Sequence, residues 1–155
     1  MNYPAGSRGS HPQRVAAVIA AHNVGRAVAA TVRACRAIPS VDLLIVVDDG
    51  STDDTGRAAR AAGAVVVRHS VERGRASAIE TGVKVAAMRD RPAGPPRHIL
   101  LLSPDLGESA VEATALVEAV FARQADMAIA VPATGREYSG YGPGVARRLI
   151  RRKTG

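Results

Sequence analysis

Two adjacent aspartates, Asp48 and Asp49, follow the apolar run LLIVV and precede the turn residues Gly50 and Ser51. An ionised carboxylate only accepts hydrogen bonds, so in a sheltered cleft it can bind the ring N–H of a nucleotide base or ribose hydroxyls. The alternative is structural, with Asp49 shaping the turn into Gly50 and Asp48 capping nearby amides. The pair alone leaves both interpretations open.

Other residues that could bind a nucleotide also follow apolar runs. Gly74 and Arg75 stand at the start of an expected helix, where backbone N–H groups and a guanidinium could hold a diphosphate. Asp105 comes soon after the run HILLL, and a carboxylate there suits a hard divalent cation that bridges phosphate oxygens. These positions together predict a cleft for nucleoside, diphosphate and metal.

The elements that must position these residues alternate along the chain. Hydrophobic periodicity predicts strands at 15–20, 42–47, 64–68, 98–102 and 126–131, and helices at 24–37, 52–62, 75–89 and 108–123. Ser51 and Asp54 resemble a capping box for the second helix, and Gly63 stands where a C-cap glycine belongs. The alternation predicts an α/β fold: a Rossmann-like, doubly wound, mainly parallel sheet with helices on both faces, whose ligands bind at the carboxyl ends of the strands.

Composition limits the class of protein. The chain has 155 residues, of which 46% are hydrophobic but only 3% aromatic, so we expect one domain with a core of Val, Ile, Leu and Ala. Its one cysteine, Cys35, cannot form an internal disulfide; we expect it to pack in the core, and the cysteine usage predicts a reducing cytoplasm. The net charge of +7 is concentrated in residues 143–155, and the scarcity of aromatic residues argues against nucleic-acid binding.

The chain is expected to contain three segments. Residues 1–13 are rich in Gly, Ser and Pro and predict a disordered leader, and residues 14–135 predict the nucleotide-binding domain. Residues 136–155 predict a glycine-rich connector and a basic tail helix. That tail is either a solvated end or a contact with an anionic membrane surface, so the expected location is cytoplasmic, with a peripheral position on the inner face of the membrane as the second possibility.

Two common phosphate-binding loops are absent from the sequence. There is no G-x-G-x-x-G after the first expected strand and no G-x-x-x-x-G-K-[ST] anywhere, which excludes the usual dinucleotide-binding and P-loop signatures. Instead, four segments resemble glycosyltransferase family 2, the GT-A-fold enzymes that include polyprenyl-phosphate sugar synthases. In order, they are VAAVIAAHNVGRAVAATVRA, LLIVVDDGSTDDTGRAARAAGA, RGRASAIETG and HILLLSPDLGES, and they span roughly residues 14–131.

The resemblance implies roles for single residues. Asp49, beside Asp48, would contact the base of the donor, the loop Ala20, Ala21, His22 and Asn23 would surround the nucleoside, and Gly74 and Arg75 would lie near the phosphates. Ser103 and Asp105 match the first and last positions of the family's D-x-D motif, so Asp105 would hold Mg²⁺ or Mn²⁺. The implied reaction transfers a sugar from a UDP- or GDP-linked donor to an acceptor hydroxyl or a lipid phosphate.

The sequence also departs from the family's pattern. Ser103 and Pro104 leave one carboxylate where the D-x-D motif offers two. Family members normally continue into an acceptor-binding half, so the resemblance implies that residues 136–155 are a truncated end and that the catalytic base is not identified. A non-catalytic nucleotide-sugar-binding protein or regulatory remnant is therefore the alternative function.

Among the histidines, His69 and His98 are expected to be polar strand-end residues.

Overall fold

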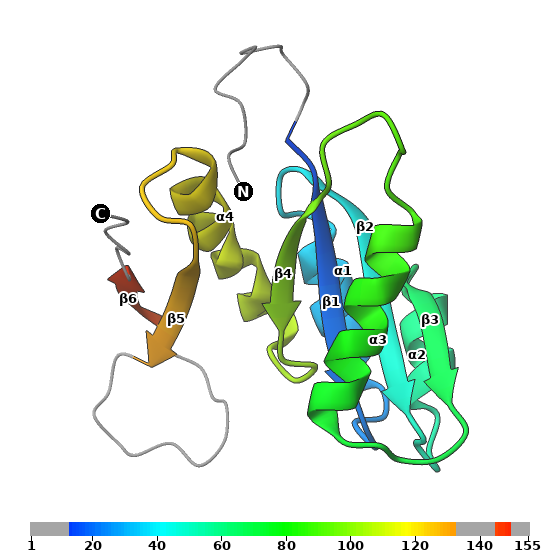
Figure 1. Ribbon diagram of the computed structural model, residues 1–155. Coiled ribbons are helices and arrows are strands. Elements are labelled where there is room, and N and C mark those ends of the chain that lie inside the picture. The colour runs from blue at the N-terminus through cyan, green and yellow to red at the C-terminus, as the bar shows by residue number, and fades with distance from the viewer. Residues whose placement is uncertain (1–12, 133–144, 150–155) are drawn as a thin grey trace.

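The computed structural model of the protein describes residues 13–132 and 145–149 (Figure 1). The elements, in chain order, are β1 (Val15–Ala21), α1 (Ala27–Cys35), β2 (Val41–Asp49), α2 (Thr55–Ala61), β3 (Val65–His69), α3 (Arg75–Met88), β4 (His98–Leu102), the 3-10 helix η1 (Gly107–Ala113), α4 (Thr114–Phe121), β5 (Ala128–Pro132) and β6 (Val145–Leu149). The expected leader, apart from residue 13, and most of the expected connector and tail lie outside the described residues.

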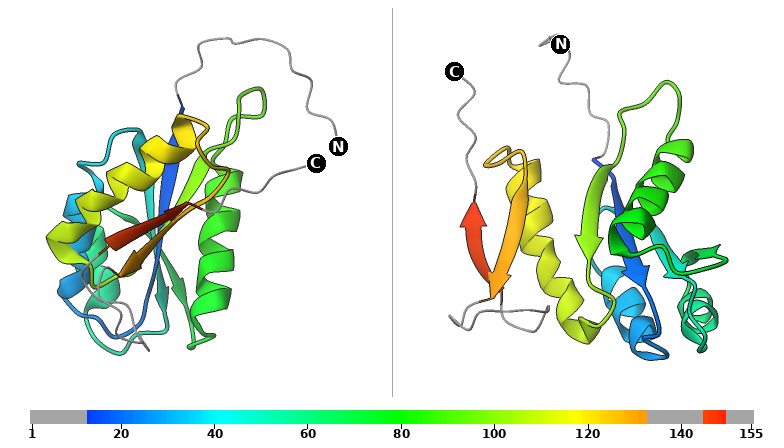
Figure 2. Two further views of the ribbon diagram at one scale, coloured as in Figure 1. Left: turned by 90° about the vertical axis from the view of Figure 1, so that its left-hand side faces the viewer. Right: turned by 60° about the horizontal axis from the view of Figure 1, so that its bottom comes forward.

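Four strands form one parallel sheet in the order β3-β2-β1-β4, which confirms the predicted α/β architecture. Figures 1 and 2 show α3 on one face of this sheet and α1 and α2 on the other. In the register, Ala21 pairs with Asp48, and Asp49 pairs with His69. The residues that follow the strands therefore meet at one edge of the sheet.

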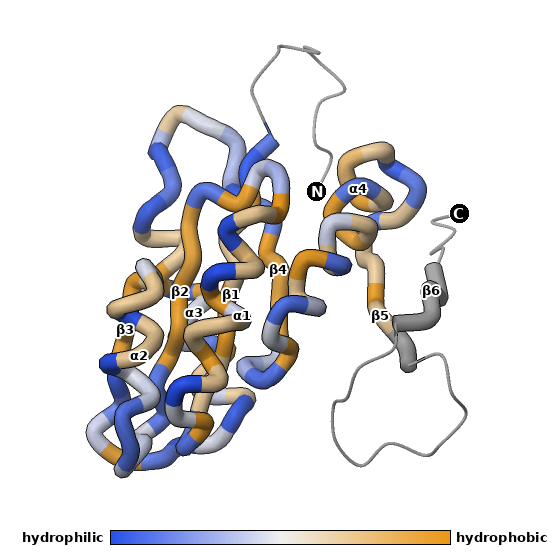
Figure 3. Tube along the Cα trace, turned by 180° about the vertical axis from the view of Figure 1, so that it is seen from behind, coloured by the Kyte–Doolittle hydropathy of each residue, from blue (hydrophilic) through white to orange (hydrophobic). Residues whose placement is uncertain are grey.

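Apolar side chains fill both faces of the sheet. Alternate residues of β1 point to opposite faces, so Ala17 and Ile19 pack toward α1 together with Val28 and Val32. Ala16 packs on the other face, against α3. The central strands β1 and β2 are accordingly apolar along most of their length in Figure 3.

Helix α3 approaches the sheet closely because its buried face consists of small residues. These are Ala78, Gly82 and Ala86. A Cβ atom on Gly82 would lie 2.3 Å from Cγ1 of Val18 and 3.3 Å from Cγ2 of Val47. Glycine at this position therefore sets the distance between α3 and the sheet.

The C-terminal part of the chain differs from the sequence prediction. The fifth strand, β5, pairs antiparallel with β6 in a separate two-stranded sheet, and α4 lies between it and β4 (Figures 1 and 2). The basic tail helix expected over 145–153 is wrong for residues 145–149, which form β6. Helix propensity is a weak preference, and pairing with the backbone of β5 outweighs it.

Two smaller predictions at helix ends also change. The helix expected at 108–123 begins as η1 and becomes α-helical only from Thr114. The capping box is wrong: α2 has Asp54 at its N-cap without a side-chain cap, and Asp53 instead accepts from the backbone N–H of Thr55 at 2.9 Å. Within the two described stretches, no helix combines the length and the apolar character needed to cross a membrane.

Replacing Gly82 with alanine tests the close approach of α3. Overpacking of this kind costs about 1–3 kcal/mol, whereas helix propensity alone would make alanine more stable by about 1 kcal/mol. We expect Gly82→Ala to lower the free energy of unfolding in urea denaturation. The double variant Val18→Ala/Gly82→Ala should lose less than the sum of the single losses, because Val18→Ala removes the clashing methyl group. A Gly82→Ala protein as stable as the wild type would contradict this packing.

Candidate functional site

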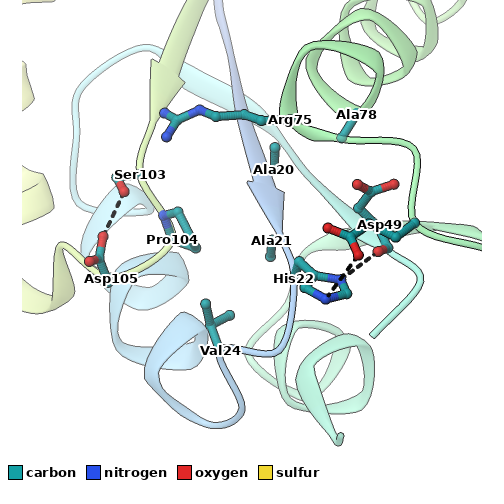
Figure 4. Close-up of a pocket in the computed structure, with 11 residues that line it drawn as sticks. Ala20, Ala21, His22, Val24, Asp49, Arg75, Ala78, Ser103, Pro104 and Asp105 are labelled. Carbon is teal, nitrogen blue, oxygen red and sulfur yellow. Dashed lines mark hydrogen bonds and ion pairs between the residues drawn. The ribbon is translucent and has the colours of Figure 1, made fainter. Parts of the chain in front are cut away.

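A cavity of about 350 Å³ lies at the carboxyl ends of the strands (Figure 4). Seven of the residues singled out in the sequence line it: Ala20, Ala21, His22, Asp49, Arg75, Ser103 and Asp105. Val24, Glu72, Ala78 and Pro104 complete the lining. Three residues singled out in the sequence do not line the cavity but hydrogen-bond to residues at the strand ends beside it: Asn23, Asp48 and Gly74.

The carboxylate of Asp49 is buried and accepts three hydrogen bonds. Its Oδ1 accepts from Nδ1 of His69 at 2.6 Å and from the backbone N–H of Arg73 at 2.9 Å, and its Oδ2 accepts from the backbone N–H of Gly74 at 2.8 Å. Strand β2 is thereby tied to the turn that leads into α3. Gly74 is the N-cap of α3 with a φ of 87°, a left-handed conformation that favours glycine.

The hydrogen bonds decide the charge of Asp49. Burial alone would raise the pKa of this carboxyl, but the backbone N–H of Arg73, the ring of His69 and the backbone N–H of Gly74 together outweigh burial and hold the pKa below its ordinary value. Asp49 is therefore ionised at neutral pH. An ionised carboxylate accepts only, so Nδ1 of His69 carries the hydrogen of their shared bond.

His69 is outside the cavity lining, but it holds Asp49 in place, a role that the sequence analysis did not predict. It is buried at the end of β3 rather than being a simple polar strand end, and its Nε2 lies 2.9 Å from Oγ1 of Thr81. The register places it beside Asp49, and no motif marks it along the chain. Only the parallel pairing of β2 with β3, neighbouring strands that α2 separates along the chain, brings these residues together.

Asp48 has a different role from its neighbour. Its Oδ1 accepts from the backbone N–H of Ser51 at 3.0 Å, and its Oδ2 accepts from Nη1 of Arg68 at 2.6 Å. A Cβ atom on Gly56 would lie 2.5 Å from that Oδ2, so α2 packs directly against the carboxylate. Asp48 therefore caps the turn, as the structural alternative predicted for it.

The loop after β1 is joined to the loop after β2. The backbone N–H of Asn23 donates to Oγ of Ser51 at 3.0 Å, and Oδ1 of Asn23 accepts from the backbone N–H of Thr52 at 2.8 Å. Nδ1 of His22 lies 2.7 Å from the backbone oxygen of Asp49. Asn23 thus fixes the loop, and His22 is the member of the pair that reaches the cavity.

The other wall of the cavity is held by α1. Oγ1 of Thr31 donates to the backbone oxygen of Pro104 and accepts from the backbone N–H of Gly107, both at 2.8 Å. This clamp fixes the turn that carries Asp105. The hydroxyl of Ser103 donates to Oδ1 of Asp105 at 2.6 Å, and Asp105 itself is exposed.

The carboxylate of Asp105 is a suitable oxygen ligand for a divalent cation, but the wall offers few further protein ligands. Among the described residues, no group of three or more His, Cys, Asp or Glu side chains could hold a metal. Mg²⁺ commonly uses one or two carboxylates together with substrate phosphates and water. Asp105 therefore fits as a single protein ligand and not as part of a complete protein cage.

The remaining singled-out residues lie outside the chemistry of the cavity. Cys35 is fully buried, and desolvation raises the pKa of its thiol to about 12 against the opposing effect of its backbone hydrogen bond, which confirms a packing role. His98 contacts Phe121, with ring centroids 5.2 Å apart. Four other acidic residues near the strand ends also lie outside the cavity lining: Asp53, Asp54, Glu108 and Glu112.

The lowered pKa of Asp49 predicts how stability depends on pH. A group whose pKa is lower in the folded state stabilises the fold above its unfolded pKa, about 3.9 for aspartate, and loses that effect as the pH falls through the folded value. We expect Asp49→Asn to lower the free energy of unfolding by about 1–3 kcal/mol at pH 7. The three N–H donors of His69, Arg73 and Gly74 would then face a neutral side-chain amide, whose NH2 group cannot accept a hydrogen bond. The difference in the free energy of unfolding between wild type and Asp49→Asn should shrink below about pH 4. The control Asp105→Asn should unfold like wild type at each pH, and a pH-independent gap for Asp49→Asn would contradict the role of the charge.

Known proteins resemble this chain in sequence. Residues 16–89 match the sequence profile of Glycosyl transferase family 2. An uncharacterized protein of Methanocaldococcus jannaschii is 34% identical over 86 residues, which are 56% of this chain and 33% of that protein. The chain therefore spans about a third of the length of this relative.

Solved glycosyltransferases share the fold. A mannosyltransferase from Pyrobaculum calidifontis in complex with GDP-Man and Mn²⁺ superposes with a TM-score of 0.51 at 18% identity, over 62% of this chain and 28% of that chain. Glucosyl-3-phosphoglycerate synthase from Mycobacterium tuberculosis superposes with a TM-score of 0.56 at 24% identity in complex with Mn²⁺, UDP and glucosyl-3-phosphoglycerate, over 70% of this chain and 39% of that chain. The sequence match and the shared sheet agree: residues 16–89 of this chain are similar to Glycosyl transferase family 2, and the chain has the α/β fold of the GT-A glycosyltransferases.

Proposed function

We propose that this chain supplies the donor-binding part of a glycosyltransferase, which transfers a sugar from a nucleotide sugar to an acceptor hydroxyl or a lipid phosphate. The observation that supports the proposal is the composition of the cavity, which places an ionised carboxylate, a guanidinium and an exposed carboxylate around one space. Each suits a different part of a nucleoside diphosphate.

The nucleoside would lie on the side of the cavity formed by the ends of β1 and β2. Ala20, Ala21 and Ala78 present small side chains that leave room for a flat ring. Asp49 lies beside them and can accept from a base N–H. The chain that surrounds the nucleoside is held in place by Asn23 and Ser51.

The diphosphate would lie between Arg75 and Asp105. Arg75 is the first residue of α3, so its guanidinium and the N-terminal end of the helix both favour an anion. A Mg²⁺ or Mn²⁺ ion held by Asp105 would neutralise the charge that develops on the leaving diphosphate. The two solved glycosyltransferases are complexes with Mn²⁺ and either GDP-Man or UDP, which supports this division of the cavity.

A second function is favoured by one observation. The cavity wall at β4 carries one carboxylate, Asp105, and a serine in place of a second. A protein that binds a nucleotide sugar without transferring the sugar does not need a second carboxylate at this wall. Release of free nucleotide from a bound donor, measured in folded protein with Mn²⁺ and an acceptor, would distinguish the transferase from a non-catalytic or regulatory binder.

The proposed lipid acceptor is supported only by the charge of the C-terminal residues. Residues 143–155 contain five basic residues and no acidic residue, which suits an anionic membrane surface or a lipid phosphate. Binding of the protein to vesicles with and without anionic lipid would test the proposed contact with a membrane surface.

Asp105 provides a test of the metal. We expect Asp105→Ala to weaken binding of UDP-glucose or GDP-mannose in isothermal titration only when Mg²⁺ or Mn²⁺ is present, with a loss of about 1.5–3 kcal/mol, the range for interactions of charged groups. In EDTA the variant and the wild type should bind equally. Glu108→Ala, a nearby acid outside the cavity, is the control and should match wild type in both buffers. Wild-type affinity that ignores EDTA would remove the metal role of Asp105.

Arg75 provides a test of the diphosphate position. Arg75→Ala should weaken binding of a nucleoside diphosphate by about 1.5–3 kcal/mol but leave binding of the nucleoside itself unchanged, because the guanidinium would contact only the phosphates. Arg89→Ala, at the other end of α3, is the matched control. Equal losses for nucleoside and diphosphate would place the phosphates elsewhere.

A further inference from the structure

We propose that His22 is a positioning residue that makes nucleotide binding depend on pH, because its neutral ring holds Asn23 and its charged ring holds Glu72 instead. The inference rests on the nucleotide-binding function proposed above and adds a regulation of that same site. It follows from the hydrogen bonds around one ring, which lies in the cavity lining beside Asp49 (Figure 4).

Two hydrogen bonds decide which ring nitrogen of His22 carries a hydrogen. Nδ1 lies 2.7 Å from the backbone oxygen of Asp49, and a carbonyl oxygen only accepts, so Nδ1 is the donor. Nε2 lies 3.0 Å from Nδ2 of Asn23. The oxygen of the same amide accepts from the backbone N–H of Thr52 at 2.8 Å, so the NH2 group of Asn23 faces the ring. Nε2 therefore accepts, and the ring is neutral in this arrangement.

The loop after β1 depends on the orientation of the Asn23 side chain. Asn23 has a φ of 48°, in the left-handed region that residues other than glycine rarely adopt. Its bonds to Ser51 and Thr52 join this loop to the loop after β2. By accepting from the NH2 group, His22 keeps the amide oxygen directed at Thr52. The neutral ring therefore helps to hold the loop that would surround the nucleoside.

A proton on Nε2 reverses this arrangement. A charged imidazole has two donors and no acceptor, so it cannot accept from Asn23. Oε2 of Glu72 lies 3.6 Å from Nε2 and can accept the new hydrogen. Histidine side chains take up a proton between about pH 5 and 8, so the exchange of partners needs no extreme pH. The charged ring thus leaves the loop and binds the turn before α3.

The charged groups of the cavity lining that surround His22 come from several elements. They are Asp49 at the end of β2, Glu72 in the turn before α3, Arg75 at the start of α3, and Asp105 after β4. The carboxylate of Asp49 already accepts three hydrogen bonds from the protein. The side chain of Glu72 is 62% exposed and can move toward the ring. Glu72 is therefore the partner that a charged His22 takes.

Titration with UDP-glucose and with GDP-mannose at about pH 8 and about pH 5.5, at one Mg²⁺ concentration, tests the coupling. Both ends of the diphosphate are esterified in these probes, so the ligand keeps its charge across this range. We expect the wild type to bind about three- to tenfold more weakly at the lower pH, the scale of one lost hydrogen bond. His22→Gln should bind equally at both values, because its amide oxygen can accept from Asn23 and cannot be protonated in this range.

Three further variants serve as comparisons. His98→Gln, a histidine outside the cavity lining, should keep the wild-type ratio. Glu72→Gln should move the loss of affinity to lower pH, because an amide stabilises a charged ring less than a carboxylate does. Glu80→Gln, an acid of α3 that is 64% exposed, should leave the loss where it is. Equal wild-type affinity at the two pH values, or an unchanged loss in His22→Gln, would overturn the coupling and leave the proposed function standing.

NMR of the nitrogen-labelled, ligand-free protein tests the exchange of partners without a nucleotide. The ring signals of His22 are those that disappear in His22→Gln. At about pH 8 we expect the hydrogen on Nδ1, and we expect the ring to titrate at lower pH in Glu72→Gln than in the wild type. A hydrogen on Nε2 instead, or a titration that Glu72→Gln leaves unchanged, would overturn the exchange. Folded protein that shows the exchange but binds no nucleotide sugar would overturn the proposed function and the coupling to it, and not the exchange itself.

Discussion

The charge of Asp49 holds the ends of β2 and β3 and the start of α3 together. A carboxylate buried at the end of a strand is unfavourable unless donors surround it, and here the donors come from the end of β3 and from the turn before α3. The same bonds that offset the desolvation of Asp49 therefore fix where α3 begins. The position of Arg75, one residue after Gly74, is a consequence of this arrangement.

Adjacent aspartates can do different work because successive strand residues point to opposite faces of a sheet. Asp48 reaches toward α2, where it caps Ser51 and pairs with Arg68. Asp49 reaches toward α3 and the cavity. Both carboxylates hold neighbouring elements in place, and of the two only Asp49 also lines the cavity.

The limits of sequence analysis follow from the range of the interactions involved. The four parallel strands and the helices between them depend on local periodicity, and the apolar runs predicted their order along the chain correctly. His69 could not be recognised, because its role depends on the register of β2 against β3. Residues 145–149 were predicted as a helix from their basic and apolar pattern, but the observed strand depends on a partner, β5, that no local pattern reveals. The positions of Asp49 and Asp105 at strand ends were predictable; the bonds that fix them were not.

The two sides of the cavity are built with different stiffness. On one side, Asp49 is buried and held by three donors, two of them backbone groups, so its geometry does not depend on a ligand. On the other side, the side chains of Arg75 and Asp105 are exposed, although Thr31 fixes the turn that carries Asp105. Exposed long side chains lose more freedom when they bind than buried ones do. The geometry around Asp49 is therefore preformed, whereas the side chains of Arg75 and Asp105 would lose freedom on binding any ligand.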